Sequence, residues 1–179
     1  MKNTVDIKKL TALALLTAIV IILQAFVRIQ FGIFAISTVL IPIVIGGALY
    51  GIWAGAWLGL VFGATVLLSG DAAFFLGINA PGTIFLVIAK GILCGVAAAF
   101  TYKILKAKSP LAAAIASGIV CPIVNTGVFV ICSRIFFYDS ILYILTAIVG
   151  INFFVELGVN IVLNPVIMRL IKYIKKRYS

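Results

Sequence analysis

The chain has 179 residues, of which 65% are hydrophobic and only 10% are charged, and its mean hydropathy is +1.33. Soluble domains carry about 25% charged residues, so this composition excludes an ordinary soluble domain and indicates an integral membrane protein. A net charge of +10 in a soluble chain would suggest nucleic-acid binding, but here the basic residues lie between long apolar runs, which indicates membrane topology instead.

Six apolar segments are candidates for membrane-spanning helices, each of which needs about 20 residues. In chain order they are residues 10–28, 33–50, 52–69, 82–104, 110–135 and 141–171. The first is interpreted as a span and not as a secretory signal, because it is long and no Ala-x-Ala cleavage site follows. We therefore expect one all-α domain over residues 1–179, built as a bundle of six transmembrane helices.

Turn and capping residues support this division of the chain. Gly51 allows a tight turn between the second and third spans. Pro81 suits the first turn of the fourth span, and Ser109 followed by Pro110 has the pattern of an N-cap and first helical residue at the start of the fifth.

The basic residues predict the orientation. With the N-terminus in the cytoplasm, six spans return the C-terminus to the cytoplasm, and only Arg28 and Arg134 lie outside. Lys90 lies within a span. The cytoplasmic basic residues are then Lys2, Lys8, Lys9, Lys103, Lys106, Lys108, Arg169, Lys172, Lys175, Lys176 and Arg177. This asymmetry obeys the positive-inside rule.

The third span carries a row of glycines spaced four residues apart. They are Gly51, Gly55, Gly59 and Gly63. Such a row forms a smooth helix face that another helix can approach closely, either within the bundle or in self-association. Trp53 and Trp57 lie near the cytoplasmic end of this span, where aromatic belts occur.

Polar residues recur every four positions in the sixth span. They are Asn152, Glu156, Asn160 and Asn164. On a helix they form a stripe along one side, which does not face lipid at low cost. The stripe suits interhelical hydrogen bonds or a ligand site, and Asn164 before Pro165 also suits repair of a kinked backbone.

Three spans place polar groups at a similar depth. At about 1.5 Å per residue, Lys90 lies ~12 Å, Asn125 ~14 Å and Asn152 ~16 Å below the outer ends of their helices, with Glu156 one turn deeper. Asn125 has a second interpretation, because it can satisfy a carbonyl freed by Pro122. The convergence predicts a polar cavity in the outer half of the bundle.

Lys90, in "IFLVIAKGILCG", has three interpretations: an ion pair with Glu156, a contact to an anionic ligand, or snorkelling to the interface. An ion pair in the empty site is compatible with a ligand contact. The chain has no histidine, no GxxxxGK[ST] loop and three cysteines without metal spacing. We therefore expect no enzyme activity, no metal and no cofactor, and buried cysteines.

The whole chain resembles the substrate-binding S components of energy-coupling factor (ECF) vitamin transporters. The resemblance rests on six short spans, on "ALLTA" in the first span and on "IPIVIGGALYGIWAGAWLG" across the second and third. It implies a prokaryotic plasma-membrane protein that binds a vitamin near the outer face. It also implies a transmembrane coupling protein and two cytoplasmic ATPase subunits as partners, with Ala14 and Ala18 on the docking face. Transport in that family is thought to involve toppling of the loaded S component.

On this hypothesis Lys90 neutralises an anionic group of the ligand, and Asn125, Asn152 and Glu156 bond its polar body. Arg134 and residues 70–80 then close over it. A small carboxylate such as pantothenate suits the single lysine. Riboflavin is the next candidate, since a flat ring suits the outer aromatics Phe74, Phe75, Phe85 and Phe137. The alternatives are a stand-alone transporter or channel that needs no ATPase, and a structural scaffold.

Overall fold

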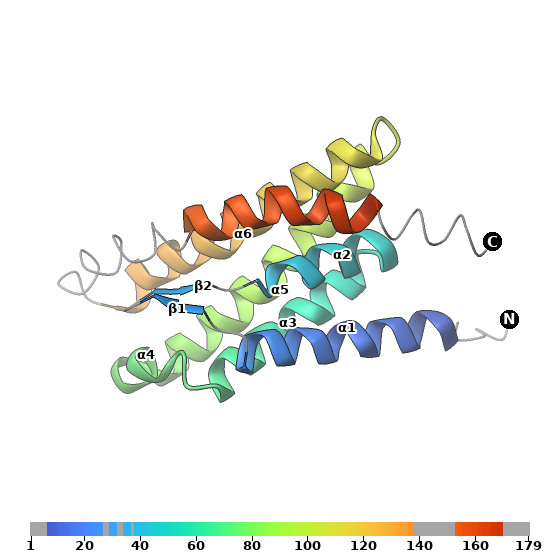
Figure 1. The fold of residues 1–179 in the computed structure, drawn as a ribbon. Coiled ribbons are helices and arrows are strands. Elements are labelled where there is room, and N and C mark those ends of the chain that lie inside the picture. The colour runs from blue at the N-terminus through green and yellow to red at the C-terminus, as the bar shows by residue number, and fades with distance from the viewer. Residues whose placement is uncertain (1–6, 27–28, 32–33, 37, 138–152, 170–179) are drawn as a thin grey trace, which may run out of the picture.

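Helices dominate the protein, as its computed structural model shows over residues 7–26, 29–31, 34–36, 38–137 and 153–169 (Figure 1). The elements are α1 (Ile7–Ala25), β1 (Ile29–Phe31), β2 (Phe34–Ile36), α2 (Leu40–Tyr50), α3 (Ile52–Leu68), α4 (Ala73–Ile78), α5 (Ala80–Leu105), α6 (Pro110–Phe136) and a helix over residues 153–169. Within the described ranges, α1, α5 and α6 are long and apolar enough to cross a membrane. The expectation of a helical membrane protein is confirmed.

The start of the second expected span was wrong. Residues 33–50 were assigned to one helix, but α2 begins only at Leu40, and β1 and β2 precede it as an antiparallel pair in which Gln30 lies opposite Ala35. Pro42 lies in the first turn of α2, where its missing N–H costs no hydrogen bond, so the helix starts close to that residue. The apolar residues before it suit a strand as well as a helix.

Glycines hold α3 and α5 with their backbones in contact. A Cβ atom added at Gly59 would meet the carbonyl oxygen of Gly91, and one added at Gly91 would meet that of Gly59. Gly55 and Gly95 face each other in the same reciprocal way. We call these four residues the glycine seam. The row of glycines in α3 therefore packs within the bundle, and its partner is a second glycine pair that the sequence analysis did not single out.

Gly51 has a different role from the glycines of the seam. Its φ of +95° lies in the left-handed region, and it connects α2 directly to α3. A side chain is disfavoured in that conformation, so the tight turn predicted at this residue is confirmed.

The helix over residues 153–169 packs its amide stripe against α6. Asn160 Nδ2 donates to the carbonyl of Glu156 at 2.8 Å, and Asn164 Nδ2 donates to Asn160 Oδ1 at 2.9 Å. A Cβ added at Gly118 of α6 would lie 2.9 Å from the Asn160 carbonyl oxygen, so the two helices approach closely there. The bonds run along the helix. The sequence pattern had suggested bonds between helices instead.

Both predicted helix starts are capped. Ser109 Oγ accepts from Ala112 N at 3.3 Å before α6, as expected. Asn79 Oδ1 accepts from Gly82 N at 3.0 Å before α5, where Pro81 lies in the first turn. Asn79 Nδ2 also donates to the carbonyl of Phe136 at 3.3 Å, so this one side chain joins the start of α5 to the end of α6.

We expect Asn79→Ala to destabilise the protein by about 1–2 kcal/mol, the upper range for loss of an N-cap, because the interhelical bond is lost as well. Ser109→Ala removes one exposed cap bond and should cost less, about 0.5–1 kcal/mol. Thermal unfolding of the two variants in the same detergent compares them. Equal midpoints would contradict the second role of Asn79.

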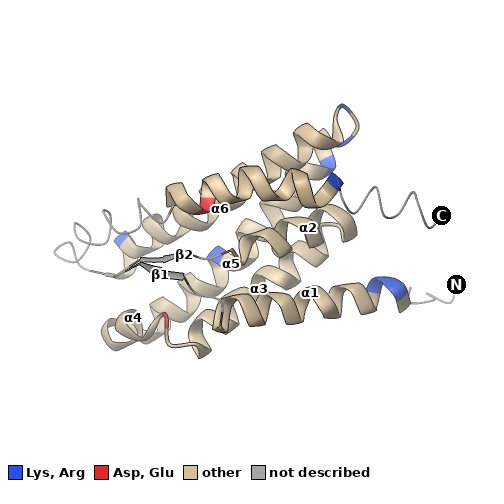
Figure 2. Ribbon diagram, in the orientation of Figure 1, with Lys and Arg blue, Asp and Glu red and all other residues tan. Residues whose placement is uncertain are grey.

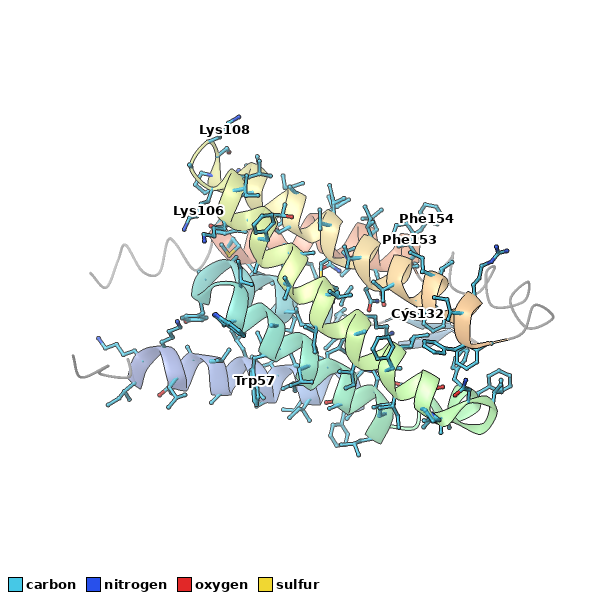
Figure 3. All side chains as sticks on the ribbon, turned by 180° about the vertical axis from the view of Figure 1, so that it is seen from behind. Trp57, Lys106, Lys108, Cys132, Phe153 and Phe154 are labelled. Carbon is cyan, nitrogen blue, oxygen red and sulfur yellow. The ribbon has the colours of Figure 1, made fainter. Side chains whose placement is uncertain are left out.

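Basic residues gather at one end of the bundle (Figure 2). That end holds the start of α1, the α5–α6 connection and the end of the helix over residues 153–169, with Lys8, Lys103 and Arg169 among its residues. Lys106 and Lys108 lie at this end in Figure 3, whereas Cys132 and Phe153 lie toward the other. Of the lysines and arginines that the structure describes, only Lys90 and Arg134 lie elsewhere.

Candidate functional site

Lys90 lies inside the helix bundle, ten residues from the start of α5. Its backbone directly precedes Gly91 of the glycine seam, so α3 approaches it closely. The side chain is half-buried, and its Nζ lies 5.4 Å from the ring centroid of Phe62 in α3 and 5.5 Å from that of Phe129 in α6. Two aromatic rings on two helices therefore flank the ammonium group in cation–π geometry.

Glu156 is a buried carboxylate that interacts electrostatically with the Lys90 ammonium group. It is only 5% exposed, and it interacts electrostatically with Lys90 and with Cys121 of α6. Its backbone carbonyl accepts from Asn160, which fixes it at the start of the amide stripe. The ion-pair interpretation of Lys90 therefore has electrostatic support, because the two opposite charges attract each other.

Asn125 lies on the α6 face that meets α5. One turn away on one side, Phe129 contacts Lys90. One turn away on the other, the Cys121 thiol lies beside that of Cys94, which is itself one turn from Lys90. Asn125 is therefore level with Lys90 across the α5–α6 contact. We call Lys90, Asn125 and Glu156 the polar cluster, and the three residues come from three helices.

Asn125 makes no hydrogen bond in the part of the chain that the structure describes. The residue is 7% exposed, and its Oδ1 is buried without a partner. It does not satisfy the backbone carbonyl that Pro122 frees, which was its alternative structural interpretation. The Asn125 side-chain oxygen can therefore accept a hydrogen bond from a molecule inside the bundle.

Two other predicted site residues do not join this cluster. Arg134 is exposed in the last turn of α6, at the end opposite the lysine-rich end. Asn152 lies outside the described residues. Ala14 and Ala18 are both exposed on α1, away from the contacts of α1 with α2 and α3.

The predicted outer loop, residues 70–80, contains α4, which covers the end of α6. Phe75 of α4 lies with its ring centroid 5.6 Å from that of Phe129 and 5.3 Å from that of Phe137. Phe75 and Phe137 were among the expected outer aromatics. Phe74 and Phe85 are 60% and 61% exposed, and their rings contact those of Phe75 and Phe136.

The C-terminal end of α1 is held to the same loop. Gln24 is buried and its Nε2 donates to Asp71 Oδ2 at 2.6 Å. Ser69 Oγ donates to the same oxygen at 3.0 Å. Asp71 therefore links α1, the end of α3 and the turn that leads into α4.

Sequence reasoning missed Phe62 and Phe129 as neighbours of Lys90. Phe62 is 4% exposed in α3, directly before Gly63. Its position beside the glycine row was a usable signal, because a residue next to a close helix contact is also near the partner helix. Phe129 is one helical turn from Asn125, which was a usable signal as well.

The arrangement suits binding more than bond chemistry. It offers one ammonium group, one carboxylate and one amide, flanked by aromatic rings. The described residues hold no group of three or more potential metal ligands. Cys94 and Cys121 are buried free thiols, as expected, and Cys132 is partly buried.

These features define a multi-pass membrane protein with a polar cluster enclosed by apolar helices. A family model described as "ECF transporter, substrate-specific component" matches residues 8–168, and the chain belongs to this family. Its members are transport proteins and not enzymes. Membership implies a small-molecule substrate and interaction with an ECF module. No curated protein matches the chain.

Proposed function

We propose that this substrate-specific component binds a water-soluble vitamin from outside the cell and passes it inward with partner ATPases. The observation that carries the proposal is the polar cluster, because ionisable residues enclosed by apolar helices are costly and commonly mark substrate or ion pathways. The chain has no phosphate-binding loop of its own, so energy comes from the transmembrane coupling protein and two cytoplasmic ATPase subunits.

The proposed topology is six spans with both termini in the cytoplasm of a prokaryotic cell. The gathering of basic side chains where α1 begins and α5 ends supports it, since cytoplasmic ends carry the excess of Lys and Arg. Arg134 then lies outside, where it meets an incoming anion before the ligand reaches Lys90. Asn152 retains its proposed role as a hydrogen-bonding residue for the ligand.

The favoured ligand is a small carboxylate of the pantothenate type. Lys90 neutralises its anionic group, and Asn125 and Glu156 bond its polar body. Riboflavin is the second candidate, favoured by the rings of Phe62 and Phe129 on either side of Lys90, which suit a flat aromatic ligand. Residues 70–80, with Phe75 at their centre, close the outer end.

Ala14 and Ala18 form the proposed contact with the coupling protein. Both are exposed and four residues apart on α1, so they present a small, smooth surface on one side of that helix. A helix of the coupling protein can approach that side closely.

Reconstitution tests the proposed division of labour. Proteoliposomes with this chain, the coupling protein and both ATPases should accumulate radiolabelled pantothenate when ATP is enclosed in their lumen. Proteoliposomes with the chain alone should bind the vitamin without accumulating it. Uptake by the chain alone, without ATP, would instead establish the stand-alone transporter. A module with catalytically inactive ATPases is the matched control.

A further inference from the structure

Asn125 differs from the other buried asparagines in the described part of the chain, because its side chain makes no hydrogen bond there. Asn160 and Asn164 are fully buried and their side chains are bonded to each other, although Asn164 Oδ1 also has no donor. Asn125 is 7% exposed, and its Oδ1 has no hydrogen-bond donor. A buried acceptor without a donor is rare in native proteins, and the usual explanation is a partner that is absent from the structure.

The position of Asn125 indicates which partner is absent. Phe129, one turn along α6, contacts the ammonium group of Lys90, and Cys121, one turn in the other direction, contacts Cys94 of α5. A molecule held by Lys90 therefore lies beside Asn125 Oδ1. Packed helix axes are about 8–10 Å apart, so only a few bonds separate the group at Lys90 from the group at Asn125.

The polar face of α6 continues from Asn125 toward the end of the helix. Ser133, two turns further on, is 3% exposed, and its Oγ also has no hydrogen-bond partner among the described residues. Positions eight apart on a helix lie on the same side. A ligand that extends along α6 from Asn125 therefore meets a second polar atom.

We infer that Asn125 selects the substrate by accepting a hydrogen bond, so that the substrate is a carboxylate with a hydroxyl or amide N–H a few bonds from its anionic group. The inference rests on the proposed function and narrows the class of vitamin. An aliphatic acid without such a donor would leave Asn125 Oδ1 unpaired, and a site built to bond a hydroxyl or N–H rejects analogues that lack it.

Ligand pairs test this directly on the wild-type protein. Pantothenate carries a carboxylate, an amide N–H and hydroxyl groups. Its affinity is compared by calorimetry with those of a deoxy analogue and an N-methylated amide analogue. We expect at least one analogue to bind ten or more times more weakly than pantothenate. Equal affinity of all three would overturn the inference alone, whereas no binding of pantothenate would overturn the carboxylate assignment as well.

A variant assigns the selectivity to Asn125. Asn125→Leu has a similar side-chain volume and no acceptor, so it should reduce the preference for pantothenate over the weaker analogue to less than twofold. Thr126→Val, at the adjacent position on α6, removes a hydroxyl from a different side and should keep the full preference. A preference that persists in Asn125→Leu would overturn the inference. The wild-type comparison decides the question if this variant does not fold.

Discussion

Lys90→Met should weaken pantothenate binding at least tenfold, which corresponds to about 1.4 kcal/mol or more, while the protein still folds. Methionine keeps an unbranched side chain between Phe62 and Phe129 but removes the positive charge that attracts the carboxylate. Calorimetry of the purified protein gives the affinity, and size-exclusion chromatography in detergent reports the fold. Unchanged affinity in a folded variant would refute the ligand contact.

Glu156 provides the control for that result. If Lys90 serves only as its counter-charge, the loss in Lys90→Met arises from an uncompensated carboxylate, and Lys90→Met combined with Glu156→Gln should restore binding. If Lys90 binds the ligand, the double variant should remain at least tenfold weaker than Glu156→Gln alone. Two of the three interpretations of Lys90, the structural ion pair and the ligand contact, therefore predict opposite outcomes.

Gly59→Ala should destabilise the protein by about 1–3 kcal/mol, the usual cost of an overpacked core, because the new Cβ would meet the backbone carbonyl of Gly91. Backbone atoms cannot rotate away as a side chain can, so α3 and α5 must separate. A larger residue such as leucine should prevent recovery of folded protein. Thermal unfolding in detergent measures the smaller change.

Gly127→Ala is the matched control for the seam. Gly127 is also a helical glycine, in α6, but a Cβ added there has open space around it. Alanine has the higher helix propensity by up to about 1 kcal/mol, so this variant should be as stable as the wild-type protein or more stable. If Gly59→Ala behaved like Gly127→Ala, α3 and α5 would not have their backbones in contact.

The helices could be predicted from the sequence because each is an apolar run ended by a strong signal. Gly51, Ser109 and Pro110 gave starts that the structure reproduces at Ile52 and Pro110. The region before Leu40 failed, because an apolar run without polar alternation has no period that separates a strand from a helix. Pro42 was the missed clue to where α2 begins.

The candidate site was partly predictable for a related reason. Polar residues stand out in an apolar helix, so Lys90, Asn125 and Glu156 could be singled out, and their role as a site stays a prediction. Their apolar neighbours could not be found in the same way. A helix that is apolar on all sides does not reveal which side faces its partner, so the only signals for Phe62 and Phe129 were the adjacent glycine row and the one-turn spacing from Asn125. Arg134 was expected to close over the ligand with residues 70–80, and it lies exposed in the last turn of α6.

The glycine seam limits how this protein can move its charge. At Gly55, Gly59, Gly91 and Gly95, the carbonyl oxygen of each helix lies against the facing glycine of the other, so sliding or turning one helix on the other would drive main-chain atoms into collision. The two helices therefore act as a fixed base, and Lys90 is attached to it beside Gly91. Displacement of the lysine charge during a transport cycle is left to its own flexible methylene chain, and changes in the walls around it are left to α6 and residues 153–169.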